Sequence, residues 1–200
     1  MEIAAAHPEA GCPRLRAYAR VFEAWGARVR VFEGADNCVR RTPSGFVVEV
    51  EGTANLVHEI AHALVAGRLE DDHGFDYGKI PVDPTRAEGR AILFDELTAC
   101  AMSCAFSRRD VHAWFREQIG IQHVFYGAAD VHELVARTAP VVVAHAHGLR
   151  AFERRVRARF DRALVAVGAP AWIRRPIASI CLDDLWKHHV EELERGASMP

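Results

Sequence analysis

The stretch NLVHEIAHALVAGR, residues 55–68, constrains the fold most, because it places two histidines four positions apart with a glutamate directly after the first. An α-helix turns once in about 3.6 residues, so His58 and His62 would lie one above the other on one face. Apolar residues occupy the other faces, and Gly67 stands where glycine favours a helix end. The pattern predicts a rigid helix of the zincin kind that can present two imidazoles to one metal ion.

A third ligand is expected from another segment, because two imidazoles leave a metal ion under-coordinated. The later stretch FDELTACAMSCAF has helical periodicity and offers Asp95 and Glu96. If this helix buries Leu93 and Leu97, Glu96 points inward beside small residues that leave room for a metal ion. We therefore predict Glu96 as the carboxylate ligand. Asp95 is expected to lie just outside the ligand set or, more simply, on the solvent-facing side of the helix.

Two histidines and one carboxylate admit two kinds of chemistry. With Zn²⁺ the set suits a peptidase in which Glu59 takes a proton from water. With Fe²⁺ it is the ligand type that activates O₂. Cys100 and Cys104 follow Glu96 at helical spacing, and thiolates there would favour zinc, but small buried core residues are the simpler interpretation. The ligand types alone leave both metals open.

Composition narrows the class of protein. Half of the 200 residues are hydrophobic, and a net charge of −2 gives no sign of a nucleic-acid partner. The longest apolar run, around residues 140–144, is too short to cross a bilayer. Five cysteines without a secretory leader indicate a reducing compartment. We expect a cytoplasmic protein that does not bind a membrane.

Periodicity along the chain predicts mostly helices. Two strands, residues 27–34 and 46–52, are expected to pair, with turn-rich residues 35–45 between them. Helices are expected at 14–25, 55–66, 86–106, 109–117 and 132–167, the last broken at Pro140, with residues 120–130 irregular and two weaker helical segments at the end. Thr53 or Asn55 can cap the motif helix. The prediction is an α+β fold: one helix-dominated domain, residues 1–200, with a small β-sheet near the N-terminus.

The runs VHEIAHALVAG, GFDYGKIPVD and FDELTACA together resemble the elongation factor P hydroxylase family. That family carries H-E-[IL]-[AS]-H-W-C-I-A-G, then an aromatic-rich loop before P-D-G, then a glutamate on a helix. RVRVFEGADN and FERRVRARF are also similar to family segments, so the resemblance covers most of residues 14–180. It implies a single compact domain, unlike the jelly roll of common 2-oxoglutarate oxygenases.

The resemblance also implies an activity. The family consists of non-haem iron enzymes that hydroxylate a modified lysine on elongation factor P, with Fe(II) as cofactor and O₂ as co-substrate. By match, His58 and His62 are the paired histidine ligands and Glu96 is the carboxylate ligand. Glu59 matches the motif glutamate and is expected beside the metal, where it would handle a proton or anchor a neighbour.

The chain departs from the family around the expected substrate cleft. Ala63 and Leu64 replace a tryptophan and a cysteine, and Asp71 and Asp72 stand in the loop where the family has a basic pair. The loop still offers four candidate substrate contacts: His73, Phe75, Asp76 and Tyr77. The resemblance therefore carries over to the metal site better than to the substrate.

The segment LRAFERRVRARFDRAL, residues 149–164, predicts a basic helix face. Such a face can dock an acidic protein by electrostatic steering, and the resemblance implies that elongation factor P is typically acidic. A solvated face with pairs such as Glu153–Arg157 is the simpler alternative. The acidic tail DDLWKHHVEELE can instead fold back on the arginines. All three interpretations stay open at this point.

Overall fold

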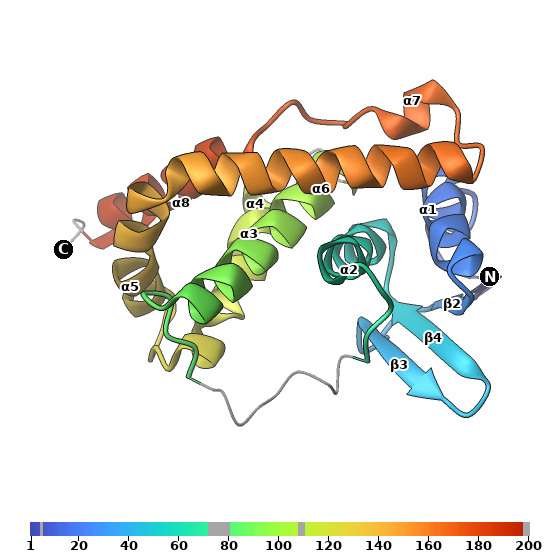
Figure 1. The fold of residues 1–200 in the computed structure, drawn as a ribbon, viewed down its shortest axis with the longest axis horizontal. Helices are drawn as coiled ribbons and strands as arrows, with labels where there is room; N and C mark the ends of the chain where they lie inside the picture. Colours follow the sequence, from blue (N-terminus) through green and yellow to red (C-terminus); the bar gives the residue numbers. More distant parts are fainter. Residues whose placement is uncertain (5, 72–80, 108–110, 198–200) are drawn as a thin grey trace.

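The structure, a computed structural model, describes residues 1–4, 6–71, 81–107 and 111–197 (Figure 1). Its elements in chain order are β1 (Glu2–Ile3), α1 (Pro13–Ala24), β2 (Ala27–Val31), β3 (Cys38–Thr42), β4 (Gly45–Val50), α2 (Thr53–Ala66), α3 (Ala87–Ser107), α4 (Val111–Gly120), the 3-10 helix η3 (His123–Tyr126), α5 (Val131–Ala144), α6 (Ala146–Ala166), α7 (Ala171–Arg174) and α8 (Leu182–Ala197). Helices dominate and the strands lie near the N-terminus, so the predicted α+β class is confirmed.

The sheet has the strand order β1-β2-β4-β3. The two strands expected from the sequence, β2 and β4, pair in parallel, with Val29 opposite Val48 and Val31 opposite Val50. These four valines are buried, and they join α1, α2 and α6 in one apolar cluster. The alternating pattern therefore fixed which side chains face the core.

The prediction that residues 35–45 form only a turn-rich connection is wrong. Strand β3 occupies part of this segment and pairs antiparallel with β4, and Thr42 and Gly45 close the hairpin. Gly45 has φ of +115°, which a side chain would strain. The sequence does not predict this strand because it lacks an alternating apolar pattern. Only Cys38 and Val39 are buried, and the arginines that follow lie at the edge of the sheet.

Helix α2 begins at Thr53, directly after the sheet, and its cap comes from far along the chain. A Glu9 carboxylate oxygen accepts hydrogen bonds from the Thr53 backbone N–H at 2.7 Å and from the Thr53 hydroxyl at 2.6 Å. Thr53 and Asn55 thus do not supply the cap themselves. The expected end at Gly67 is confirmed, because Gly67 has φ of +72° and donates to the carbonyl oxygen of Ala63 at 2.9 Å.

Helix α3 separates two apolar clusters and so lies at the centre of the fold. Its Ala99, Met102 and Ala105 belong to the cluster formed with the sheet, α1, α2 and α6. Its Leu93 and Leu97 belong to a second cluster with α4, α5 and α8. Helix α6 lies across both α2 and α3 (Figure 1). The expected burial of the leucines around Glu96 is therefore confirmed.

The predicted break at Pro140 is wrong. Helix α5 continues through Pro140 to Ala144, and the chain breaks at His145 before α6 begins. An internal proline removes one backbone hydrogen bond. Val141 and Val142, in the next turn, are buried in the second cluster, and their burial offsets that loss.

Helix α8 folds back on the arginine-rich helix α6, as one of the three alternatives anticipated. Arg150 forms an ion pair with Asp183. Arg157 binds Glu153 at 2.7 Å and the carbonyl oxygen of Ile180 at 3.0 Å. Part of the basic face is thus used within the chain. Other arginines of this helix remain exposed, among them Arg154, Arg155 and Arg162.

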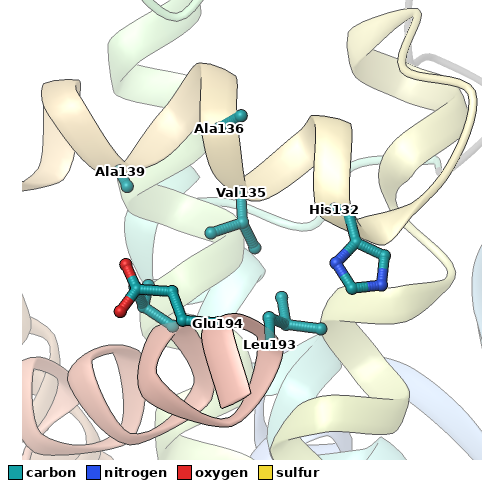
Figure 2. A pocket seen from close by; sticks show the side chains of 7 residues that line it. His132, Val135, Ala136, Ala139, Leu193 and Glu194 are labelled. Atoms are coloured by element: carbon teal, nitrogen blue, oxygen red, sulfur yellow. The ribbon is translucent and has the colours of Figure 1, made fainter. Parts of the chain in front are cut away.

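A mostly apolar pocket lies between α5 and α8 (Figure 2). It is lined by His132, Val135, Ala136, Ala139, Val190, Leu193 and Glu194. In Figure 2 the two ionisable side chains, His132 and Glu194, lie on opposite sides of it. Among the residues that the structure describes, no helix is both long and apolar enough to cross a membrane.

His189 on α8 is buried, and among the described residues neither ring nitrogen has a hydrogen-bond partner. Burial lowers the pKa of its imidazole, and the charge of Glu192 opposes that effect only in part. The folded protein therefore holds His189 neutral, whereas the unfolded chain takes up a proton as the pH falls below the ordinary value of about 6.5. This difference makes the protein less stable as the pH falls.

Between about pH 7.5 and about pH 5.5 we expect the free energy of unfolding to fall less in His189→Leu than in the wild type. The variant has no imidazole at this position that takes up a proton on unfolding. Urea denaturation at both pH values measures the difference. His147→Leu, at an exposed position, is the matched control and should follow the wild type. An unchanged pH dependence in His189→Leu would contradict the interpretation.

Candidate metal centre

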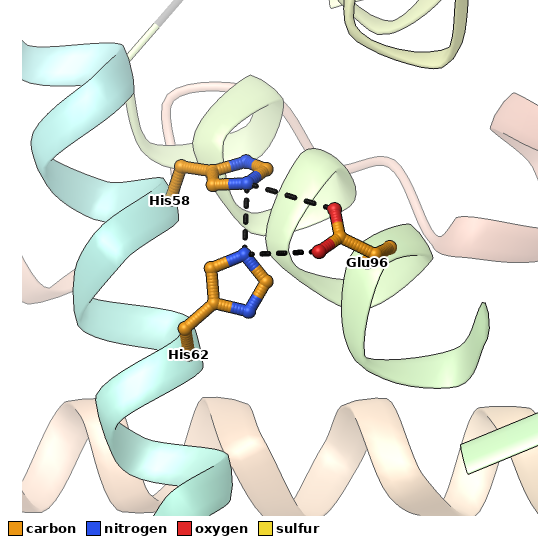
Figure 3. Close-up of side chains that lie close together, drawn as sticks. All are labelled: His58, His62 and Glu96. Carbon is orange, nitrogen blue, oxygen red and sulfur yellow. Dashed lines mark hydrogen bonds and ion pairs between the residues drawn. The ribbon is translucent and has the colours of Figure 1, made fainter. Parts of the chain in front are cut away.

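Two side chains from α2 and one from α3 meet at one point (Figure 3). The Nε2 atoms of His58 and His62 lie 2.9 Å apart. Glu96 Oε1 lies 3.5 Å from His62 Nε2, and Glu96 Oε2 lies 3.9 Å from His58 Nε2. One ligand atom from each residue falls within 4.8 Å of the others. The structure thus brings together the three residues that the sequence predicted; that they hold a metal ion stays a prediction.

The local folding of each helix produces this arrangement. The spacing of four residues puts both imidazoles on the face of α2 that looks toward α3, with ring centroids 4.7 Å apart. Burial of Leu93 and Leu97 fixes the rotation of α3 about its axis. Glu96 then points at the two histidines, as Figure 3 shows. Core packing on both helices therefore sets the geometry of the cluster.

The electrostatics of the cluster favour a cation. Burial, together with the charge of His62, holds the pKa of His58 well below its ordinary value, so its imidazole is neutral. Burial also lowers the pKa of His62, but the charges of Glu96 and Asp95 outweigh it and raise that pKa well above the ordinary value. A proton on His62 thus supplies the positive charge that a metal ion would bring. Neutral imidazole and carboxylate are the forms that bind metal.

Asp95 lies beside the ligand set rather than in the solvent. Its Oδ1 is 3.1 Å from Nδ1 of His62. A carboxylate at this nitrogen holds the proton on Nδ1 and leaves Nε2 free for a metal ion. Of the two expectations for Asp95, the structure supports the one in which it orients a ligand.

We expect Asp95→Ala to weaken metal binding by about 10- to 100-fold, because the His62 ring loses its orienting partner. Competition with a chromogenic chelator measures the dissociation constant. Glu88→Ala, at an exposed position of the same helix, is the control and should bind as the wild type does. Equal affinities in the Asp95 and Glu88 variants would show that the Asp95–His62 contact does not support the site.

Glu59, the motif glutamate, is buried with 7% of its surface exposed. It is not part of the ligand cluster, but its charge contributes to the raised pKa of His62. This places a buried carboxylate close to the histidines. The position fits either expectation for Glu59, a proton acceptor or an anchor beside the metal.

Other residues named from the sequence divide into two groups. The candidate substrate contacts His73, Phe75, Asp76 and Tyr77 lie outside the described residues. Cys100 and Cys104 are buried in the second cluster. Burial, and then the charge of Glu96, raise the pKa of Cys100, so its thiol stays protonated. Among the described residues, the group that can hold a metal contains neither cysteine.

Sequence reasoning missed two residues beside the cluster, Gln122 and Tyr126. The Gln122 amide donates to Glu96 Oε2 at 2.9 Å. The Tyr126 hydroxyl is buried without a hydrogen-bond partner among the described residues, and burial together with the charge of Glu96 raises its pKa. Both lie in or beside η3, in the segment expected to be irregular. No periodicity or motif in that segment signals their position.

The fold and the cluster define a class: a helical α+β protein whose H-E-x-x-H helix and following helix form a candidate centre of two histidines and one glutamate. Comparison of the chain with protein-family models, with curated proteins and with solved structures found no match. The function proposed below is therefore supported by the cluster and by the resemblance of the sequence to the elongation factor P hydroxylase family.

Proposed function

We propose that the protein is a non-haem iron hydroxylase that inserts one oxygen atom into a modified lysine of elongation factor P or into a related substrate. The observation that supports this proposal is the convergence of His58, His62 and Glu96 from two packed helices. Two histidines and one carboxylate with open positions form the ligand type of O₂-activating Fe(II) sites. A cytoplasmic location follows from a translation factor as substrate.

Each residue has a role that its contacts support. His58, His62 and Glu96 would hold the iron, and Asp95 would keep His62 in the tautomer that offers Nε2. Iron(II) supplies the redox chemistry with O₂. The overall reaction consumes a C–H bond, O₂, two electrons and two protons, and it yields an alcohol and water. An external electron donor such as ascorbate provides the electron pair. Buried Glu59 is placed to hold a proton beside His62.

An acidic protein is the substrate partner that the surface supports. Arg154, Arg155 and Arg162 are exposed on α6, whereas Arg150 is paired with Asp183. These three exposed arginines can speed the association with an acidic partner by electrostatic steering, but they do not determine its affinity. We propose neither nucleic acid nor a membrane as a partner.

The test is a hydroxylation assay. Protein purified without oxygen and loaded with Fe(II) is given O₂, ascorbate and elongation factor P that carries its lysine modification. We expect a mass gain of one oxygen atom on the modified lysine, and no gain with Glu96→Ala. If no protein or peptide in the cell's own lysate gains oxygen either, the proposal is wrong.

A zinc metallopeptidase is the second candidate, and the buried position of Glu59 near His62 favours it. In that reaction Glu59 would take the proton from the attacking water, as the motif glutamate does in zinc peptidases. The protein would then contain zinc as isolated and cleave casein or peptides.

Glu59→Gln separates the two candidates. For a peptidase we expect it to keep zinc and lose at least about 100-fold in cleavage rate, because general-base catalysis contributes about that much. Metal content and casein hydrolysis measure both effects, with Glu88→Ala as the matched control. Absence of cleavage by the zinc-loaded wild type would rule out the peptidase. Absence of any metal binding without oxygen would favour a non-enzymatic relative that binds a translation partner.

A further inference from the structure

We infer that Gln122 is a positioning residue of the metal centre: its side-chain amide holds one oxygen of Glu96 and leaves the other to bind the metal. The inference rests on the proposed metal centre. It concerns which oxygen of Glu96 faces the metal, because the identity of the three ligand residues does not determine that.

The two oxygens of Glu96 have different surroundings. Oε2 accepts a hydrogen bond from Gln122 Nε2 at 2.9 Å and lies 3.9 Å from His58 Nε2. Oε1 lies 3.5 Å from His62 Nε2. A hydrogen bond to one oxygen draws charge toward it and fixes the plane of the carboxylate. Oε1 makes the shorter contact with a histidine nitrogen, and Gln122 donates to the other oxygen. Oε1 is therefore the oxygen that we expect to bind the metal.

The backbone around Gln122 is held on both sides, so its amide has a defined position. The Gln122 N–H donates to the carbonyl oxygen of Ile119 at 3.1 Å, and its own carbonyl oxygen accepts from the Phe125 N–H at 3.0 Å. Phe125 in turn accepts from the Val82 N–H at 2.8 Å. The side chain is 6% exposed, and its nitrogen also lies 3.5 Å from Cys100 Sγ.

A glutamine suits this position better than a charged donor. Lysine or arginine would pair with Glu96 and cancel the negative charge that attracts a metal ion. An amide donates a hydrogen bond without adding charge, so Glu96 stays available as an anionic ligand. Tyr126 lies four residues further along, and its raised pKa keeps its hydroxyl neutral as well. Gln122 therefore presents a neutral donor to the carboxylate of the cluster.

The experiment compares the wild type with Gln122→Met, which keeps the length of the side chain and removes the donor. We expect the metal dissociation constant to rise by about 10- to 100-fold. We also expect the visible absorption spectrum of the Co(II)-loaded protein to change, because Glu96 Oε2 loses the Gln122 donor and the carboxylate is presented to the metal differently. Gln122→His, which restores an N–H donor, should recover most of the affinity and the original spectrum. Gln118→Met, four residues earlier and half-buried, is the matched control.

The outcomes separate this inference from the proposed function. If Gln122→Met binds metal with the affinity and Co(II) spectrum of the wild type, the inference is wrong and the metal centre stands. If the wild type binds neither Zn(II) nor Co(II), the centre itself is wrong and the inference fails with it. If Gln122→Met lowers affinity but Gln122→His does not recover it, packing rather than hydrogen bonding is responsible, and the inference is again wrong. Circular dichroism checks folding, and Gln122→Leu replaces the methionine variant if that variant is unfolded.

Discussion

Glu96→Ala is expected to abolish stoichiometric metal binding and to leave the helical fold intact. The variant removes the only carboxylate of the three-residue cluster found in the described part of the chain. Two neutral imidazoles at one helix face bind a divalent ion weakly, because no anionic ligand remains. The side chain is 27% exposed, so its removal opens no sealed cavity in the core. Elemental analysis after reconstitution and gel filtration measures the metal content.

The control for this prediction is Glu88→Ala, an exposed position on the same helix, which should retain one metal ion per chain. His58→Ala should lose metal as Glu96→Ala does. If Glu96→Ala retained a full equivalent of metal with wild-type affinity, the third ligand would have to come from another residue.

Phe160→Ala is expected to lower the free energy of unfolding by about 3–5 kcal/mol, because a fully buried aromatic ring leaves a cavity. Phe160 is completely buried on α6. Its ring centroid lies 5.0 Å from that of Phe106 on α3 and 5.4 Å from that of Tyr18 on α1. The ring thus joins three helices across the first apolar cluster. Urea denaturation followed by circular dichroism measures the loss.

Val165→Ala, at an exposed position on the same helix, is the matched control and should change stability by less than about 0.5 kcal/mol. A loss below about 1 kcal/mol in Phe160→Ala would mean that the surrounding side chains close the cavity, contrary to the close packing seen at this ring.

The parts of the fold that local patterns encode could be predicted from the sequence. Helices α1 and α2 and strands β2 and β4 each repeat apolar residues at the period of one element. Strand β3 could not be found this way, since its outer residues are arginines next to turn residues. The continuation of α5 through Pro140 depends on burial of Val141 and Val142 in a cluster built from distant helices. Local propensity contains no information about that burial.

The same distinction applies to the candidate site. The imidazole pair of His58 and His62 follows from helix geometry alone. Glu96 is predicted from the expected burial of Leu93 and Leu97 together with the resemblance, because residues 97–106 of α3 are buried on every face and do not by themselves single out one direction. Glu9 at the start of α2 and Gln122 beside Glu96 are contacts between residues far apart in sequence. Polar residues in irregular segments have no period that indicates what they touch, so only the folded chain shows these two.

One imidazole is held at both of its nitrogens by consecutive residues of a single helix: Asp95 faces Nδ1 of His62, and Glu96 faces Nε2. Neighbours on a helix differ by about 100° in direction. A rotation or a slide of α3 against α2 would therefore break both contacts at once, and no other pair of adjacent carboxylates follows on that helix to replace them. The two contacts of His62 therefore depend on the alignment of α2 and α3. Core substitutions that move α3 relative to α2 are expected to alter metal binding as well.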